Sequence, residues 1–200
     1  MEHTPIKKRK QQAIETKERI FNATISLIRE RGFNNVLMED ITKAAGVSAG
    51  LFYNYFANKA DVITEAFCYR SGKYYDAMEQ EMQDIKGMAK LRKIVGHMAT
   101  LRQEIYDKEE LRYHHVNILE THKRLEDVQE NASKLHKMIA NSLAEAKAAG
   151  EVPAAMDTEN MCKVVMLVLR GATWEYLAAT GEYPFEERTW DIISGYIKGI

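Results

Sequence analysis

Residues 41–56 combine two short helical patterns with a sharp turn between them, and this arrangement serves recognition rather than catalysis. Ala45 is small enough for two helices to cross closely, and Gly46 can adopt the left-handed conformation with which a helix ends. Val47 can fill the angle between the helices, and Ser48 can cap the next one. The segment is therefore predicted to be a helix-turn-helix, whose second helix enters the major groove of DNA.

The second helix of this segment has two distinct sides. At roughly 100° per residue, Phe52 and Phe56 fall about 40° apart, and we expect both to anchor the helix in the core. The opposite side is short and uncharged and carries Gly50, Leu51 and Asn54, flanked by Tyr53 and Tyr55. It is expected to make few base contacts, with Asn54 bonding a base edge and Leu51 touching a thymine methyl.

Phosphate contacts are expected to supply most of the affinity, because they position a protein on a duplex without reading sequence. Candidates are Ser48, the phenol groups of the two tyrosines, and Lys59 at the start of the next helix. The full set expected to lie at DNA is Lys43, Ser48, Ala49, Gly50, Leu51, Tyr53, Asn54, Tyr55 and Lys59. Two plainer interpretations stay open: a packed helical hairpin, and tyrosines that are ordinary surface aromatics.

The amino-terminal part of the chain is basic. Residues 1–60 hold ten Lys or Arg against six acids, whereas the remaining 140 residues hold 18 against 23. The run Lys7-Lys8-Arg9-Lys10 opens this region. It is either a solvated tail or an arm that reaches an adjacent groove or phosphates, and both versions add positive potential.

An ordered set of residues surrounds the turn: Gly32-Phe33, Asp40-Ile41, Ala45-Gly46-Val47-Ser48-Ala49-Gly50, Tyr53, Tyr55-Phe56 and Lys59. Over about residues 12–67 this set resembles the amino-terminal signature of the TetR family of ligand-responsive transcription regulators. The resemblance implies a homodimeric repressor on a palindromic operator, with half-sites about 34 Å or a multiple apart. It also implies a small apolar or aromatic effector that releases the DNA by shifting the helix from Asn58 to about Gln83.

The chain departs from the family pattern at Val36-Leu37, where the family has a threonine that caps the second helix. Asn34 or Asn35 is expected to cap this helix instead. Leu37 is not expected to bind DNA.

Composition predicts an all-α protein of about nine helices. Proline is scarce at 3 of 200 residues, and helix-favouring residues dominate a chain that is 46% hydrophobic. We expect a three-helix DNA-binding domain in residues 1–57, a connecting helix in 58–84, and a helical ligand-binding and dimerisation domain in 85–200. Helices are expected there at about 88–106, 109–120, 125–149, Thr158–Thr180 and Phe185–Ile200.

The helix predicted at Thr158–Thr180 is apolar on nearly every side from Val164 to Leu169. A helix that is apolar all round needs partners on both sides. We therefore expect it to pack, together with Phe185–Ile200, against the same helices of a second copy, as a four-helix bundle in a homodimer.

An effector pocket is implied by the family resemblance rather than by any residue pattern. Side chains capable of lining it are Met98, Leu101, Tyr106, Tyr113, His114, Ile118, Met166 and Trp174. Most of them are expected to be ordinary core, and no sequence rule separates the two roles.

Other classes of protein are disfavoured. The six histidines and the cysteines Cys68 and Cys162 lack metal-ligand spacing, so no metal, other cofactor or disulfide is expected. No catalytic motif is present, so an enzyme is not expected. No apolar run is long enough to span a membrane and no secretory signal is visible, so a cytoplasmic protein is expected. A helical ligand-binding protein that has lost DNA binding and an enzyme of the helical class remain as alternatives.

Overall fold

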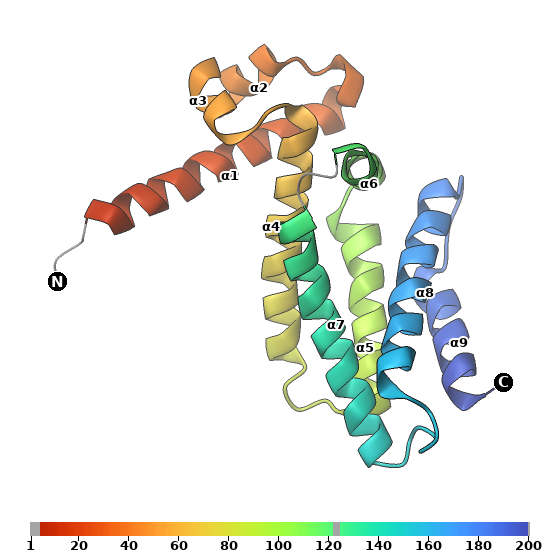
Figure 1. Cartoon of the computed structure of the whole chain (residues 1–200). Coiled ribbons are helices and arrows are strands. Elements are labelled where there is room, and N and C mark those ends of the chain that lie inside the picture. Colours follow the sequence, from red (N-terminus) through yellow and green to blue (C-terminus); the bar gives the residue numbers. More distant parts are fainter. Residues whose placement is uncertain (1–4, 122–124, 200) are drawn as a thin grey trace. The chain divides into compact units, whose positions relative to one another are not determined.

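The computed structural model describes residues 5–121 and 125–199, and within these ranges the chain is helical, without a strand (Figure 1). Its helices are α1 (Pro5–Arg31), α2 (Met38–Ala45), α3 (Ala49–Tyr55), α4 (Lys59–Glu81), α5 (Gly87–Thr100), α6 (Lys108–Thr121), α7 (Leu125–Ala148), α8 (Thr158–Ala178) and α9 (Phe185–Lys198). A 3-10 turn, η1 (Phe33–Asn35), follows α1, and a π-helical turn, η2 (Leu101–Ile105), follows α5. The predicted all-α class is confirmed.

The chain divides into two compact units. The first holds α1, α2, α3, the start of α4 up to Tyr69, and α6 from Glu109. The second holds α4 from Arg70, then α5, η2, α7, α8 and α9. This grouping differs from the division expected from the sequence, which assigns α6 to the carboxy-terminal domain.

One hydrophobic core fills the first unit. It is built from Ile20, Phe21, Ile25, Leu27, Ile28, Val36, Ile41, Ala45, Phe52, Phe56, Val62, Ile63 and Ala66. Ala23 of α1 and Met38 of α2 pack against this core, whereas Ile14 of α1 does not belong to it. Ile14 is 36% exposed, because the buried part of α1 begins only at Ile20.

Helix α6 is fixed within the first unit by a row of polar and aromatic contacts. Asn117 Nδ2 donates to Thr64 Oγ1 at 2.8 Å and to the carbonyl of Ala60 at 3.3 Å. The carboxylate of Glu110 lies 3.7 Å from Arg29 Nη2. These partners are far apart in sequence, which explains why α6 groups with α1 and α4.

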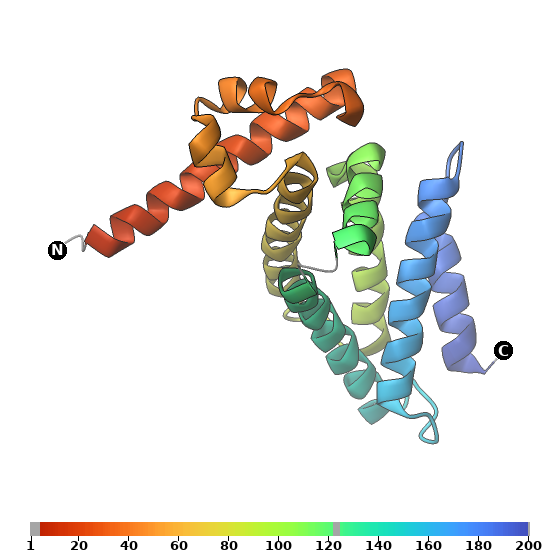
Figure 2. The same cartoon turned by 45° about the horizontal axis from the view of Figure 1, so that its top comes forward.

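The second unit is a bundle in which α5 packs against α7 and α9, and α8 packs against α7 and α9 (Figures 1 and 2). Its largest fully buried side chains include Leu91, Ile94, Met98, Leu101 and Phe185. No helix in residues 5–121 or 125–199 is long and apolar enough to cross a membrane. The predicted helix at Phe185–Ile200 is observed to Lys198, and Ile200 lies outside the described residues.

Candidate nucleic-acid interface

The turn between α2 and α3 has the local structure that its sequence predicts. Gly46 ends α2 in the left-handed region, at φ 64°. The amide of Val47 donates to the carbonyl of Thr42 at 3.0 Å, and the half-buried Val47 side chain packs against the core. Ser48 caps α3, because its Oγ accepts a hydrogen bond from the amide of Leu51 at 3.1 Å. These contacts fix the direction in which α3 leaves the turn.

Two phenylalanines hold α3 in the first unit. Phe52 and Phe56 are 0% and 1% exposed, and their ring centroids lie 5.5 Å apart. Phe56 also contacts Phe21 of α1, with a centroid distance of 5.7 Å. The predicted anchoring side of α3 is therefore confirmed, and the opposite side of the helix is exposed to solvent.

The side of α3 away from these rings is bare. Ala49, Gly50 and Asn54 are exposed, and Tyr53 is 58% exposed. A Cβ added to Gly50 would meet no heavy atom within 4 Å. Ser48 and Lys43 are exposed beside this surface. We call the surface formed by Lys43, Ser48, Ala49, Gly50, Tyr53 and Asn54 the recognition face.

Leu51 and Tyr55 lie at the margins of the recognition face and are half-buried. Tyr55 packs against the core, and Lys17 Nζ lies 5.9 Å from its ring centroid. Lys17 in turn forms a 2.8 Å ion pair with Glu65 of α4. Tyr55 therefore has a packing role in the core, in addition to any contact that it makes with DNA.

The structure gives Lys59 a role other than the predicted phosphate contact. Its ammonium group donates to the carbonyls of Phe33 at 2.5 Å and Val36 at 2.9 Å, and it lies 4.3 Å from the centroid of the Phe33 ring. Burial lowers the pKa of Lys59. The lysine thus ties the start of α4 to the segment between α1 and α2, and two of its three N–H groups are used in these bonds.

The expectation that Asn34 or Asn35 caps α2 is wrong. Both lie in η1, and Asn35 Nδ2 donates to the carbonyl of Arg31. The residue at the cap position is Leu37, whose amide donates to Asp40 Oδ2 at 3.0 Å. Its side chain is 63% exposed and makes no capping bond, because leucine has no group that can accept from the helix.

The basic run at the start of the chain is helical. Helix α1 begins at Pro5, and the side chains of Lys8, Arg9 and Lys10 are exposed on it. The run is therefore part of a regular helix and not an irregular tail. This stretch lies on the helix that also carries the core residues Ile20 and Phe21.

The eight candidate effector residues fall into both units. Tyr113, His114 and Ile118 lie on α6, in the first unit, where Tyr113 stacks on Phe33 and His114 on Phe67, with centroid distances of 4.0 and 3.7 Å. Met98, Leu101, Tyr106, Met166 and Trp174 lie in the second unit. Four of these five are buried, whereas Trp174 is 53% exposed. Burial agrees with the expectation that most are core.

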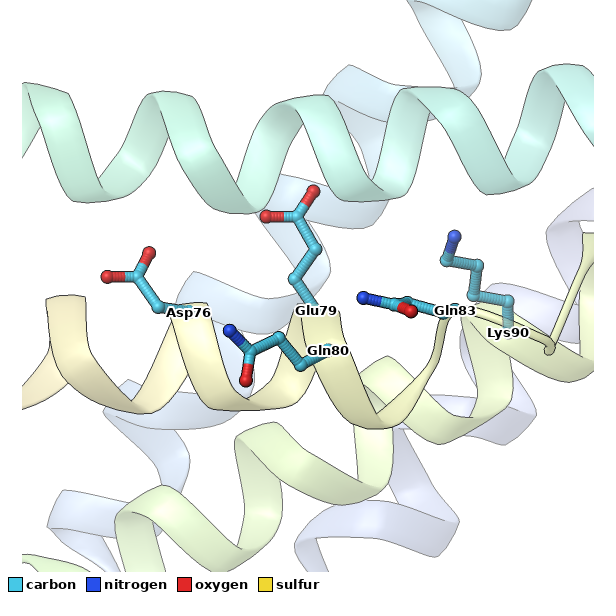
Figure 3. Close-up of a pocket in the computed structure, with 5 residues that line it drawn as sticks. All are labelled: Asp76, Glu79, Gln80, Gln83 and Lys90. Atoms are coloured by element: carbon cyan, nitrogen blue, oxygen red, sulfur yellow. The ribbon is translucent and has the colours of Figure 1, made fainter.

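A hollow of about 640 Å³ opens on the second unit, at a place that the sequence did not indicate. It is lined by Asp76, Glu79 and Gln80 of α4, Gln83 of the turn that follows, and Lys90 of α5 (Figure 3). Asp76 is already paired with Lys134 of α7 at 2.8 Å. None of the candidate effector residues lines this hollow, and its polar surface does not suit an apolar ligand.

Arg102 on η2 is a residue that sequence reasoning missed. Its Nε donates to Thr173 Oγ1 at 2.6 Å, its Nη1 donates to the carbonyl of Met98 at 3.0 Å, and its guanidinium carbon lies 5.2 Å from the Phe185 centroid. Burial lowers the pKa of Arg102. Within the described residues its partners are a hydroxyl, a carbonyl and an aromatic ring, so no carboxylate balances its charge. Met98 is a local partner four residues earlier, whereas Thr173 is 71 residues later and is brought to Arg102 only by the fold.

No group of three or more His, Cys, Asp or Glu side chains that could hold a metal ion occurs within residues 5–121 and 125–199. His3 and His122 lie outside the described residues. Cys68 and Cys162 are buried, and no disulfide joins them.

Helices α2 and α3, with their bare outer face, define a helix-turn-helix of the kind that binds DNA. Residues 20–66 match the family described as bacterial regulatory proteins, tetR family. The resemblance seen in the sequence signature is therefore confirmed over these residues.

The chain is 32% identical over 65 residues to the fatty acid metabolism regulator protein of Bacillus subtilis (strain 168). The similar stretch covers 32% of this chain and 34% of that protein, so the chain spans about a third of the length of this curated relative. The relative is named as a regulator, in agreement with the expectation that the chain is not an enzyme.

Two solved structures share the fold over nearly the whole chain. Thermus thermophilus FadR, a TetR family transcriptional repressor in complex with lauroyl-CoA, is 20% identical, with a TM-score of 0.69 over 92% of this chain and 94% of that one. Bacillus subtilis FadR in complex with stearoyl-CoA is 18% identical, with a TM-score of 0.64 over 92% and 98%. The all-helical architecture of both units is therefore that of TetR-type regulators.

Proposed function

We propose that this protein is a ligand-responsive transcriptional repressor that binds a palindromic operator as a homodimer. The observation that carries this proposal is the recognition face, because it is bare, narrow and opposite the anchors Phe52 and Phe56. Asn54 is proposed to bond a base edge and Leu51 to touch a thymine methyl. Ser48, Tyr53 and Lys43 are proposed to contact phosphates, and Lys59 is left out because two of its three N–H groups already bond carbonyls of the chain.

A homodimer is supported by an apolar face on the last two helices. Leu167 and Trp174 of α8 are 63% and 53% exposed, and Ile192 of α9 is 57% exposed. Between the two α8 residues lies Gly171, and a Cβ there would meet no heavy atom within 4 Å. Large apolar side chains beside an open glycine suit close packing against the same helices of a second copy. Two-fold symmetry then presents two recognition faces to half-sites about 34 Å or a multiple apart.

The proposed effector combines an apolar chain with an anionic head group, as a fatty-acyl thioester of coenzyme A does. Lauroyl-CoA and stearoyl-CoA are the ligands named for the two structures of similar fold. In this chain, Arg102 supports an anionic group, because its guanidinium stands in the second unit without a carboxylate partner among the described residues. A charge held in such surroundings gains from an incoming anion.

Effector and operator are proposed to oppose each other. Helix α4 contributes to both units, with Tyr69 in the first and Arg70 in the second, so a shift of its second half is transmitted along a continuous helix. Such coupling is reciprocal: the effector weakens operator binding by the factor by which the operator weakens effector binding. A repressor acts where the chromosome is, so the proposed location is the cytoplasm.

The DNA proposal is tested by selecting fragments of the host chromosome on the purified protein and measuring their affinity by mobility shift. Tyr53→Phe removes one exposed hydroxyl and is expected to weaken operator binding about tenfold, since the bond it makes is to a charged phosphate. Tyr176→Phe, in the second unit, is the matched control and should bind like wild type. If no chromosomal fragment is selected while an effector still binds, the protein is a ligand-binding protein without DNA binding.

The effector proposal is tested by thermal shift with lauroyl-CoA, coenzyme A, dodecanoate and dodecanol. A ligand that binds only the folded state stabilises it and so raises the melting temperature. At a concentration one hundred times the dissociation constant, the free energy of unfolding rises by about 2.7 kcal/mol. We expect lauroyl-CoA to stabilise the protein and to release the operator, and dodecanol to act more weakly than dodecanoate. Equal effects of the charged and neutral twelve-carbon ligands would remove the role proposed for Arg102.

A further inference from the structure

The first part of α1 extends away from the packed body of its unit. Residues 8–12 are all exposed, Ile14 is 36% exposed, and the first buried residue of the helix is Ile20. Both views show this stretch projecting past α2 and α3 (Figures 1 and 2). At 1.5 Å per residue, residues 5–15 form a rod of about 16 Å. We call residues 5–15 the amino-terminal arm.

The arm carries a compact block of positive charge. Lys7, Lys8, Arg9 and Lys10 follow one another, and the acids nearest to them in the sequence are Glu2 and Glu15. Glu15 accepts a hydrogen bond from Gln11 at 3.1 Å. Among the contacts of the described residues, the first ion pair of α1 is made by Lys17, beyond the basic block.

This charge does nothing for the stability of the fold. An exposed stretch buries no apolar surface, and cations in the first turns of a helix oppose the positive end of its dipole. The arm therefore holds a block of cations on a rigid support, in the same unit as the recognition face. A polyanion is the partner that this charge fits.

We propose that the amino-terminal arm binds operator phosphates as an intact helix, next to the groove that the recognition face occupies. A helix with its side chains is about 10–12 Å wide, whereas the minor groove of B-DNA is about 6 Å wide. The arm is therefore too wide to enter the minor groove and contacts the sugar-phosphate backbone from outside. It adds affinity but no sequence preference. This inference rests on the proposed function, because it requires that the protein bind a duplex.

The test compares wild type with a variant in which Lys8, Arg9 and Lys10 are all replaced by alanine. Alanine favours helix, so circular dichroism should be unchanged. Each lost phosphate contact lowers the slope of log K against log salt by about 0.9, and the proposed dimer presents two arms, so the slope should fall by roughly 5. Between 50 and 200 mM salt, wild type should then lose roughly 1,000-fold more affinity than the variant loses. The preference for operator over a scrambled duplex should stay the same.

A second triple variant controls for net charge. Lys86, Lys93 and Lys137 are exposed lysines of the second unit outside α8 and α9, and their replacement by alanine removes the same charge. The salt slope of this variant should match wild type. The proposal is overturned if the arm variant keeps the wild-type salt slope, or if both triple variants lose the same amount of slope. It is also overturned if the arm variant loses affinity for the operator but not for the scrambled duplex, because that outcome means base readout.

The helical form of the arm is tested by Gln11→Pro, which keeps every cation but interrupts the helix. We expect this variant to lose part of the salt slope, as the cations are no longer held in line with the rest of α1. A wild-type slope would mean that a flexible tail is sufficient, and the helical arm would be refuted. Failure of the proposed function looks different, since wild-type protein would then bind neither operator nor scrambled duplex.

Discussion

Replacing Gly50 by alanine separates the stability of α3 from its use as a reading surface. Gly50 is exposed on the second position of the helix, and a Cβ there meets no heavy atom within 4 Å. Alanine is favoured over glycine in a helix interior by about 1 kcal/mol, and in the first turn of a short helix we expect about 0.5 kcal/mol of added stability. For a chain of this size, that gain raises the melting temperature by roughly 1–2 °C.

The same methyl group should harm DNA binding, because the recognition face must lie against base edges. A methyl group at this position keeps α3 farther from the base edges and so disturbs the neighbouring contacts of Tyr53 and Asn54. The loss of one good contact costs about 1–3 kcal/mol of binding free energy. We therefore expect Gly50→Ala to weaken operator binding about tenfold or more.

Thermal unfolding and mobility shift on the same protein sample measure both effects. Gly181→Ala is the control: a Cβ at Gly181 also meets nothing within 4 Å, but this glycine lies between α8 and α9. The control should bind operator like wild type. A Gly50→Ala protein that is more stable and binds the operator with unchanged affinity would refute the orientation assigned to α3.

Three further changes test other parts of the molecule. Leu167→Glu places a charge on the exposed apolar face of α8, and light scattering should report monomers; a stable dimer would mean that subunits associate elsewhere. Lys59→Met leaves the carbonyls of Phe33 and Val36 without their donor and should cost about 1–2 kcal/mol of unfolding free energy in denaturant titration, with no change in the salt slope of DNA binding. Burial lowers the pKa of His114 well below 6.5, and the neighbouring His115 lowers it further, so the folded state resists protonation of His114. Stability should therefore fall as the pH drops below about 6.5, by up to about 1.4 kcal/mol per pH unit, and His114→Gln should flatten this fall.

The sequence predicted those features of the first unit that depend on neighbours in the chain. Gly46 and Ser48 set the end of α2 and the start of α3 through hydrogen bonds within a few residues, so these boundaries could be read directly. The spacing of Phe52 and Phe56 gave the buried side of α3 for the same reason.

Features that depend on distant partners could not be predicted in this way. Lys59 was assigned to phosphate because lysine at a helix start suits an anion, but its partners lie 26 and 23 residues earlier in the chain. Ile14 continues the apolar period of α1, yet nothing in the sequence says that the core reaches only as far as Ile20. Tyr113 and His114 look like pocket residues by type, and only tertiary contacts place them against Phe33 and Phe67.

The membership of α6 in the first unit has a consequence for dissecting or recombining such proteins. The chain passes between the units within α4, again before α6, and once more after it. A fragment cut at a single point, for instance after residue 57, would leave behind Val62, Ile63 and Ala66, which belong to the core of the first unit. Chimaeras joined at one junction would likewise pair α1 with a foreign α6. Exchanging the first unit between regulators therefore requires several junctions in the chain rather than one.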